Sequence, residues 1–196
     1  MTDQLSLSEG RDLETPIETE LLILVDEADR ELGYLDRARC HAGRGLLHRA
    51  FSLLIFNAKG QLLLQQRAAS KQLWPLVWSN SCCSHPRRNE SIDAAARRRL
   101  HEELGLDCPL HFLFKFQYHA QFNSAAAENE LCSVFIGRAT EGVTVNPAEI
   151  NAWRWISPRA LHREMAGPDK AKFTPWFRLE WERLWAEHRA DILALA

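Results

Sequence analysis

Apolar side chains in the first third of the chain fall in short runs that are bounded by polar turn residues. The run Leu21 to Val25 predicts a short buried strand. The runs Phe51 to Phe56 and Leu62 to Leu64 predict two further strands, joined by a turn at Asn57 to Gly60. Because both runs are apolar at successive positions, this hairpin is expected to be buried on both faces. The fold is therefore expected to begin near Glu20.

The pattern becomes helical between Ser91 and Gly105. Apolar residues recur every four positions from Ile92 to Leu104, Ser91 is a residue type that favours the N-cap, and Gly105 is suited to end the helix. This segment therefore predicts one central helix.

The remaining chain predicts two strands and a terminal helix. Leu110 to Tyr118 and Leu131 to Arg138 are strand-like, and Thr174 followed by Pro175 is typical of a helix start. Beyond this start, large side chains recur at intervals of three or four residues, as on one face of a helix: Trp181, Leu184, Trp185 and His188. Strands, a central helix, strands and terminal helices together predict a mixed α/β (α+β) sandwich.

Composition supports one compact domain. The chain has 196 residues, of which 46% are hydrophobic, enough for a single sizeable core. Residues 1–18 are polar and acidic and are expected to form a disordered tail, which leaves residues 19–196 as the domain.

Charge and cysteine content exclude several classes of protein. The net charge of −2 argues against a nucleic-acid coat or a polybasic membrane-surface protein. Five cysteines, an odd number, argue against a secreted disulfide scaffold, and the apolar runs are too short to span a membrane. We therefore expect a soluble cytoplasmic protein with free thiols, without nucleic-acid or membrane partners.

The central helix carries the first candidate chemistry. The segment 84–106 resembles the Nudix signature, and Glu102 and Glu103 near the helix end offer oxygen ligands of the kind Mg²⁺ prefers beside a substrate diphosphate. The alternative is that Arg98 with Glu102, and Arg99 with Glu103, form ion pairs on a solvated helix face.

Two positions depart from the hydrolase form of that signature. Ser84 replaces its first Gly, and Arg99 stands where the hydrolases have a metal-binding Glu. A guanidinium cannot bind a cation or act as a base near neutral pH, but it can hold a phosphate. Hydrolysis is therefore disfavoured.

A cysteine and histidine cluster precedes the helix. Pro86 favours an extended His85, and in an extended segment Cys83 and His85 point to one side while Cys82 points to the other. One thiol is then a candidate for the site and the other for the core.

Two further histidines and two glutamates complete a candidate ligand set. Gly43 and Gly45 lie between His41 and His48 and disfavour a single helix that carries the two histidines. Each histidine is therefore expected in a loop or at a strand edge. The last two candidates are Glu128 and Glu130. They are two positions apart, so on a strand both carboxylates lie on the same face. Three imidazoles and two carboxylates suit Zn²⁺ or Mn²⁺, although each residue alone could equally be an ordinary polar residue.

The combined motifs resemble a known family, type I isopentenyl-diphosphate delta-isomerase. The resemblance extends from Glu20 to the C-terminal helix, and it includes Asn-Ser-Cys-Cys-Ser-His-Pro at 80–86 and Glu-Asn-Glu-Leu-Cys at 128–132. Further matching segments are Phe56 to Gly60, Arg67 to Lys71, Trp74-Pro75 and Thr174 to Trp176. The resemblance implies a Nudix-type mixed sheet sandwiched between helices. It also implies an isomerase that interconverts isopentenyl and dimethylallyl diphosphate for isoprenoid biosynthesis.

The resemblance also implies the roles of individual residues. A Zn²⁺ or Mn²⁺ ion is expected to bind His41, His48, His85, Glu128 and Glu130. A Mg²⁺ ion that bridges the diphosphate is expected at Glu103 and the backbone carbonyl of Cys83. The diphosphate itself is expected to contact Arg37, which stands where the family commonly has Lys, together with Arg67, Lys71 and Arg99.

The reaction needs an acid and a base on opposite sides of a flat allylic unit. We expect Glu130 with Tyr118 to be the acid and the Cys83 thiolate, favoured by nearby cations, to be the base. Trp176, and less strongly Trp78, could face the carbocation. The alternative for Trp176 is a core position at the start of the helix.

Two rival functions stay open at this point. One is a Nudix hydrolase of nucleoside or isoprenoid diphosphates, and the other is an inactive binding module that uses the same pocket. The expected oligomeric state is a monomer or weak dimer.

Overall fold

The computed structural model describes residues 21–140 and 142–194. The predicted disordered tail at residues 1–18 lies outside this range, so that prediction is not tested. Among the described residues, no helix has the length and apolar character needed to cross a membrane.

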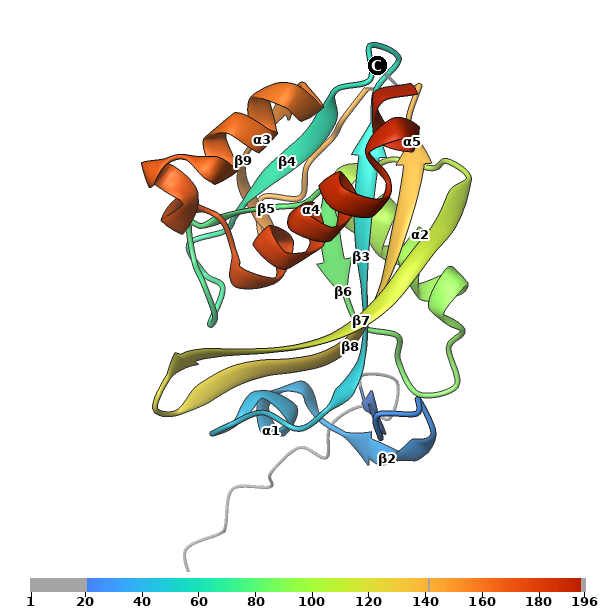
Figure 1. Ribbon diagram of the computed structural model, residues 1–196. Coiled ribbons are helices and arrows are strands. Elements are labelled where there is room, and N and C mark those ends of the chain that lie inside the picture. Colours follow the sequence, from blue (N-terminus) through green and yellow to red (C-terminus); the bar gives the residue numbers. More distant parts are fainter. Residues whose placement is uncertain (1–20, 141, 195–196) are drawn as a thin grey trace, which may run out of the picture.

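A mixed sheet forms the centre of the fold (Figure 1). Its strands among the described residues are β1 (Leu22–Val25), β2 (Glu31–Leu35), β3 (His48–Phe56), β4 (Leu62–Arg67), β5 (Trp78–Ser79), β6 (Cys82–Ser84), β7 (Leu110–Asn123), β8 (Ala126–Arg138) and β9 (Ile150–Ile156). The helices are α1 (Arg37–His41), α2 (Ile92–Leu104), α3 (Pro158–Ala166), the 3₁₀ helix η2 (Pro168–Lys172), α4 (Pro175–Glu187) and α5 (Arg189–Ala194).

Strand β3 lies between the strands that later supply the site. It pairs in parallel with β8 from His48↔Glu130 to Phe56↔Arg138, and antiparallel with β6, where Ser52 pairs with Cys83. A sheet with parallel and antiparallel pairs is the mixed sheet that the sequence predicts. The fold prediction is confirmed.

Helices α2 and α4 cover opposite faces of β3 (Figure 1). On β3, Phe51, Leu53 and Ile55 pack with the buried face of α2, whereas Leu54 and Phe56 pack with α4. Alternate side chains of a strand point to opposite faces, so a strand covered on both sides must be apolar at successive positions. This arrangement confirms that β3 is buried on both faces.

The predicted β3–β4 hairpin is only partly formed. The turn after Phe56 is present, but β3 and β4 pair only at Phe56↔Leu62. Beyond this point β4 pairs with β9, from Leu62↔Ile156 to Arg67↔Ile150. The two strands diverge because each has a long partner elsewhere in the sheet.

The helix ends follow the sequence signals with one exception. The Ser91 hydroxyl accepts a hydrogen bond from the Ala94 amide at 3.2 Å, and Gly105 ends α2 in the left-handed region at φ +64°. Helix α4 begins at Pro175, but Thr174 does not cap it with its side chain. Its hydroxyl instead lies 2.9 Å from that of Ser79, because both side chains are buried together.

Two strands are longer than the prediction. Strand β7 continues beyond Tyr118 to Asn123, and β8 begins at Ala126 rather than at Leu131. The extensions form a long antiparallel pair in which polar residues alternate with buried ones, a pattern that weakens the apolar signal. The extension of β8 contains Glu128 and Glu130.

Candidate active site and metal centre

Five predicted metal ligands converge in one buried cluster. One ligand atom from each residue lies within 4.8 Å of the others, and all five side chains are buried: His41, His48, His85, Glu128 and Glu130. They come from four parts of the chain, namely the end of α1, the start of β3, the residue after β6, and β8. The parallel register of β3 and β8 places His48 directly beside Glu130.

A glycine turn carries the chain from α1 to β3. His41 is the last residue of a short helix and His48 the first residue of a strand, so the expectation that no single helix carries both is confirmed. The expected loop or strand edge is wrong for His41. A Cβ at Gly45 would lie 2.9 Å from the Ala127 carbonyl oxygen, so glycine allows this turn to pack closely on β8.

The imidazoles are held in the form that binds metals. The Nδ1 atom of His48 lies 2.7 Å from the Leu46 carbonyl oxygen and donates to it, which leaves its Nε2 lone pair free, 3.3 Å from Nε2 of His41. Burial lowers the pKa of His48 to about 4. Burial, followed by the charge of Arg37, also lowers the pKa of His85 well below its usual value. Neutral imidazoles are the ligand form.

The two glutamates of the cluster have opposite proton affinities. Burial raises the pKa of Glu130 to about 7, and the neighbouring charge of Glu128 adds to this effect. Burial acts in the same direction on Glu128, but its contact with His41, whose Nε2 lies 3.0 Å from Oε2, lowers its pKa overall. A carboxyl group that keeps its proton near neutral pH beside one that does not is a common acid–base arrangement.

Tyr118 extends this acid–base pair. Its hydroxyl donates to Oε2 of Glu130 at 2.6 Å, and burial raises the pKa of the phenol well above its usual value. The other oxygen of Glu130 lies 2.9 Å from Nε2 of His85. The structure therefore joins the predicted acid to both the phenol and the histidine cluster.

The donor set fits a divalent transition metal. Three imidazole nitrogens and two carboxylates, buried and converging, are ligands that such ions favour, and the hydrogen bond on His48 Nδ1 orients that ring. The cluster could therefore hold one ion.

The two adjacent cysteines face opposite sides of the sheet, as predicted. Cys82 belongs to the core under α2, together with Ala95 and Ala96, whereas Cys83 packs on the α4 side. The thiol of Cys83 donates to Oδ1 of Asn80 at 2.7 Å.

From the sequence, nearby cations are expected to favour the Cys83 thiolate. The protein's own charged groups act in the opposite direction, so this expectation is wrong for them. Burial raises the pKa of the Cys83 thiol, and the carboxyl groups of Glu180 and Glu130 raise it further. The thiol is therefore the favoured form.

Glu180 was missed by the sequence reasoning. It is fully buried on α4, and the hydroxyl of Ser52 donates to its Oε2 at 2.8 Å. Burial raises its pKa to about 8. The signal was present, because Glu180 follows Trp176 by four residues and precedes Leu184 by four, at an apolar position of the helix.

The predicted diphosphate ligands line two cavities beside the cluster. One cavity of about 280 Å³ is lined by Arg37, Arg67, Lys71 and also His41. The neighbouring cavity, of about 200 Å³, is lined by Arg99, by Arg37 again and by His85. Arg37 thus connects the four basic residues into one positively charged entrance to the cluster.

Glu149, also missed from the sequence, holds two of these cations. Its carboxylate accepts a hydrogen bond from Lys71 and lies 3.0 Å from Nη2 of Arg99. Burial opposes ionisation, but these contacts lower the pKa of Glu149 to about 2. Its position after a polar loop carries no motif that would have distinguished it.

The two glutamates of the central helix have different surroundings. Glu102 forms an exposed ion pair with Arg98 at 3.2 Å, so the solvated-face interpretation holds for it. Glu103 is buried and pairs with Arg99 at 2.5 Å, so that interpretation is wrong for Glu103. Burial raises the pKa of Glu103, although its pairing with Arg99, one of the residues of the basic entrance, opposes this effect.

Trp176 is both a core residue and a wall of the site. It is buried, its indole nitrogen donates to Ser79 at 3.1 Å, and its ring stacks on Tyr118 with centroids 6.1 Å apart. The guanidinium of Arg67 lies 5.3 Å from the same ring. Trp78, in contrast, packs against the guanidinium of Arg154 at 4.9 Å.

Comparison with known proteins places this geometry in a family. The NUDIX domain model matches residues 46–177. The chain is 41% identical over 176 residues to isopentenyl-diphosphate Delta-isomerase 2 of Photorhabdus laumondii, covering 84% of this chain and 98% of the relative. It is 44% identical to the isopentenyl-diphosphate Delta-isomerase of Burkholderia multivorans, and the match covers 84% of this chain and 92% of that relative. The chain belongs to the isopentenyl-diphosphate Delta-isomerase family.

Solved structures support the Nudix fold of this isomerase family member. A Deinococcus radiodurans protein aligns with a TM-score of 0.61 at 24% identity, covering 75% of this chain and 89% of its own. The MutT protein of Methanosarcina mazei aligns with a TM-score of 0.60 at 19% identity, covering 72% and 95%. The predicted family and fold are both confirmed.

Replacing a cluster histidine is expected to weaken metal binding. After chelation and dialysis, the wild-type chain should take up one equivalent of Zn²⁺ or Mn²⁺, and His48→Ala should bind at least about tenfold more weakly, because a buried ligand is lost. Metal content by mass spectrometry and titration calorimetry measure this. His111→Ala, at an exposed position on β7, is the control, and an equal loss in both variants would contradict the assignment.

Replacing Glu180 is expected to change how stability depends on pH. The folded state holds the Glu180 proton up to pH of about 8, whereas the unfolded chain releases it near its ordinary value of 4.5. Stability therefore falls between these values, by up to about 1.4 kcal/mol per pH unit. Glu180→Gln, which stays neutral, should gain stability relative to the wild type as pH rises.

Urea unfolding at several pH values between about 5 and 8 tests this expectation. Glu182→Gln, an exposed change on the same helix, is the matched control and should follow the wild type. A constant difference between Glu180→Gln and the wild type across this range would disprove the role of the buried charge.

Proposed function

We propose that this chain interconverts isopentenyl diphosphate and dimethylallyl diphosphate by a 1,3-allylic proton shift. The observation that carries the proposal is the placement of two proton-exchanging groups on strands at opposite edges of β3. Ser52 of β3 pairs with Cys83 of β6 on one edge and with Val134 of β8 on the other, and β8 carries Glu130. A hydrolase or an inactive binding module has no need for this pair of groups.

The substrate diphosphate is proposed to bind at the basic entrance. Arg37, Lys71 and Arg99 lie around the two cavities there, so they can hold phosphate oxygens despite the overall net charge of −2. Arg67 contributes through its charge, although its own hydrogen bonds go to the carbonyl oxygens of Leu73 and Trp74. Glu149 must share Lys71 and Arg99 with the incoming anion.

Two metal ions complete the proposed site. The three histidines with Glu128 and Glu130 would hold Zn²⁺ or Mn²⁺, and Glu103 with the Cys83 carbonyl would hold a Mg²⁺ that bridges the diphosphate. When bound, these ions supply positive charge that neutralises the diphosphate and orients the carboxylates.

The acid is proposed to be Glu130 with Tyr118. Burial raises the pKa of Glu130, which favours the protonated carboxyl group, and this group would deliver a proton to the terminal methylene carbon of isopentenyl diphosphate. The phenol of Tyr118, which donates to Glu130 at 2.6 Å, keeps the carboxyl group in place and can pass on a proton.

Cys83 is proposed to exchange the second proton, at C2 of the substrate. In the forward direction the thiol first releases its proton to solvent, and the resulting thiolate takes up the proton from C2 as the double bond moves. One carbon of the substrate gains a proton from Glu130, another loses one to Cys83, and the diphosphate stays intact. Asn80 accepts a hydrogen bond from the thiol and so fixes its orientation. The raised pKa of Cys83 makes the thiolate a strong base once it has formed.

The face of Trp176 is proposed to stabilise the tertiary carbocation between these two steps. Its ring lies in the apolar cluster with Tyr118, away from water, where a π face attracts a cation most strongly. Trp78 stays a weaker candidate because its ring is only half-buried, whereas Trp176 is buried.

We also propose a binding partner, an oligomeric state and a cellular location for the chain. The partner is a small isoprenyl diphosphate, and the chain works as a monomer or weak dimer. All five cysteines are free thiols, which agrees with the proposed cytoplasmic location.

Proton NMR of isopentenyl diphosphate with the enzyme and divalent metal tests the reaction. The methylene signals should be replaced by those of dimethylallyl diphosphate, while phosphorus NMR shows an intact diphosphate. Release of phosphate would instead indicate the hydrolase, and ligand binding without turnover in metal-loaded protein would indicate a binding module.

Because the two cysteines point to opposite faces of the sheet, replacing each of them is expected to change kcat to a different extent. Cys83→Ala should lower kcat by at least about a thousandfold because a proton-exchanging group is lost. Cys82→Ala should keep most of the activity, since that thiol is buried in the core under α2. Equal losses, measured in the same NMR assay at matched metal content, would refute the assignment of Cys83.

A further inference from the structure

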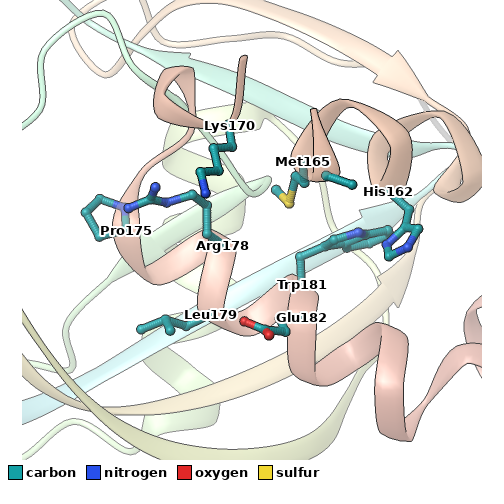
Figure 2. Close-up of a pocket in the computed structure, with 9 residues that line it drawn as sticks. His162, Met165, Lys170, Pro175, Arg178, Leu179, Trp181 and Glu182 are labelled. Carbon is teal, nitrogen blue, oxygen red and sulfur yellow. The ribbon is translucent and has the colours of Figure 1, made fainter. Parts of the chain in front are cut away.

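A third cavity lies away from the histidine and glutamate cluster, between α3, η2 and α4 (Figure 2). Its volume is about 470 Å³, larger than either cavity beside the cluster. Small-molecule sites usually have volumes of about 300–1,000 Å³. The cavity can therefore hold a small organic ligand, and the proposed reaction makes no use of it.

Two positive charges stand together on one side of this cavity. Figure 2 shows Lys170 and Arg178 on the same side of the cavity, with the guanidinium of Arg178 extending toward Pro175. Neither has an ion-pair partner among residues 21–140 and 142–194, whereas Lys172 and Arg183, on the same two helices, pair with Asp169 and Glu187. Two unpaired positive charges that line one side of a cavity repel each other, so an anion bound there would relieve the repulsion.

One buried donor at the cationic end of the cavity is also unsatisfied. The Nε atom of Arg178 is shielded from solvent and has no hydrogen-bond partner in the described part of the chain. A buried donor without an acceptor costs about 1–3 kcal/mol, so this group indicates a missing acceptor beside the two cations.

The rest of the wall is mainly apolar. Met165 and Trp181 line it, and Leu179, which is 47% exposed, stands at its edge. The one carboxylate of the lining, Glu182, lies on the opposite side from the two cations (Figure 2). Cations at one end and hydrocarbon along the wall match a ligand with a charged head and an apolar body.

We infer that this cavity binds an amphiphilic phosphate ester, with its phosphate or diphosphate at Lys170 and Arg178 and its hydrocarbon chain along Met165 and Trp181. Such a ligand can be an isoprenoid diphosphate or a straight-chain lipid phosphate. Both present the same anionic head to the two cations.

The position of the cavity connects it to the proposed active site. Pro175 and Arg178 line the cavity, whereas Trp176 between them stacks on Tyr118 and donates to Ser79. A ligand in the cavity therefore contacts the same helical turn that holds Trp176. This connection rests on the proposed function, but binding in the cavity does not.

Indole signals in ¹⁵N–¹H NMR of the full chain test the inference. The chain has seven tryptophans, and Trp181→Phe assigns the signal of Trp181. Titration with geranyl diphosphate, an isoprenoid, and with decyl phosphate, a straight-chain ester, should move the Trp181 signal. Whichever probe binds more tightly identifies the source. Inorganic phosphate and decanol, which each lack half of the ligand, should bind at least about tenfold more weakly.

The matched variants remove two charges each. Lys170→Gln/Arg178→Gln should weaken the response of Trp181 to decyl phosphate by at least about tenfold, since both head-group contacts are lost. Lys172→Gln/Arg183→Gln, on the same helices but outside the cavity, should respond as the wild type does. If the first double variant fails to fold, the exposed change Lys170→Gln replaces it.

A Trp181 signal that does not move with either amphiphile would overturn the inference. A shift confined to Trp176 would overturn it as well, because the ligand would then occupy only the proposed active site. An equal response to decanol and decyl phosphate would disprove the anion site. Loss of isomerase activity in the wild type would leave this binding result unchanged, so failure of the proposed function is detected separately.

Discussion

The parallel pairing of β3 with β8 is the contact on which the rest of the site depends. It sets His48 beside Glu130 at the end of the sheet where α1 and the segment after β6 also arrive. A shift of one residue in this register would turn the carboxylates of β8 to the opposite face, because side chains alternate along a strand. The pairing is held by apolar residues on both faces of β3, so the packing of the core fixes the geometry of the site.

Burial then determines the chemistry of the side chains that this framework brings together. The same removal from water lowers the pKa of His48 and raises those of Glu130, Tyr118 and Cys83, because in each case it disfavours the charged form. The site is therefore rich in neutral groups that can bind metal or exchange protons. Glu128 is the exception, since its contact with His41 keeps it ionised.

The central helix shows how far local signals reach. Ser91 and Gly105 mark its ends correctly, because capping depends on groups within one turn. The same sequence could not decide between Glu102 and Glu103, which are adjacent and chemically identical. Only packing against β6 and the basic entrance buries one and leaves the other exposed. Glu149 was missed for the same reason, since its partners lie far away along the chain. Glu180 differs, because its place at an apolar position of the helix was visible in the sequence.

The sequence by itself determined the central strands β3 and β4, the helices α2 and α4, the alternation that separates Cys83 from Cys82, and the motifs that resemble the isomerase family. These properties depend on residue type and on neighbours close along the chain. The tertiary structure alone decided that five ligands scattered from His41 to Glu130 meet within 4.8 Å, and that the protein's own charges favour a Cys83 thiol. It also decided that Trp176 joins the core to the site. Distances and proton affinities depend on burial and on contacts between distant segments, which local patterns do not encode.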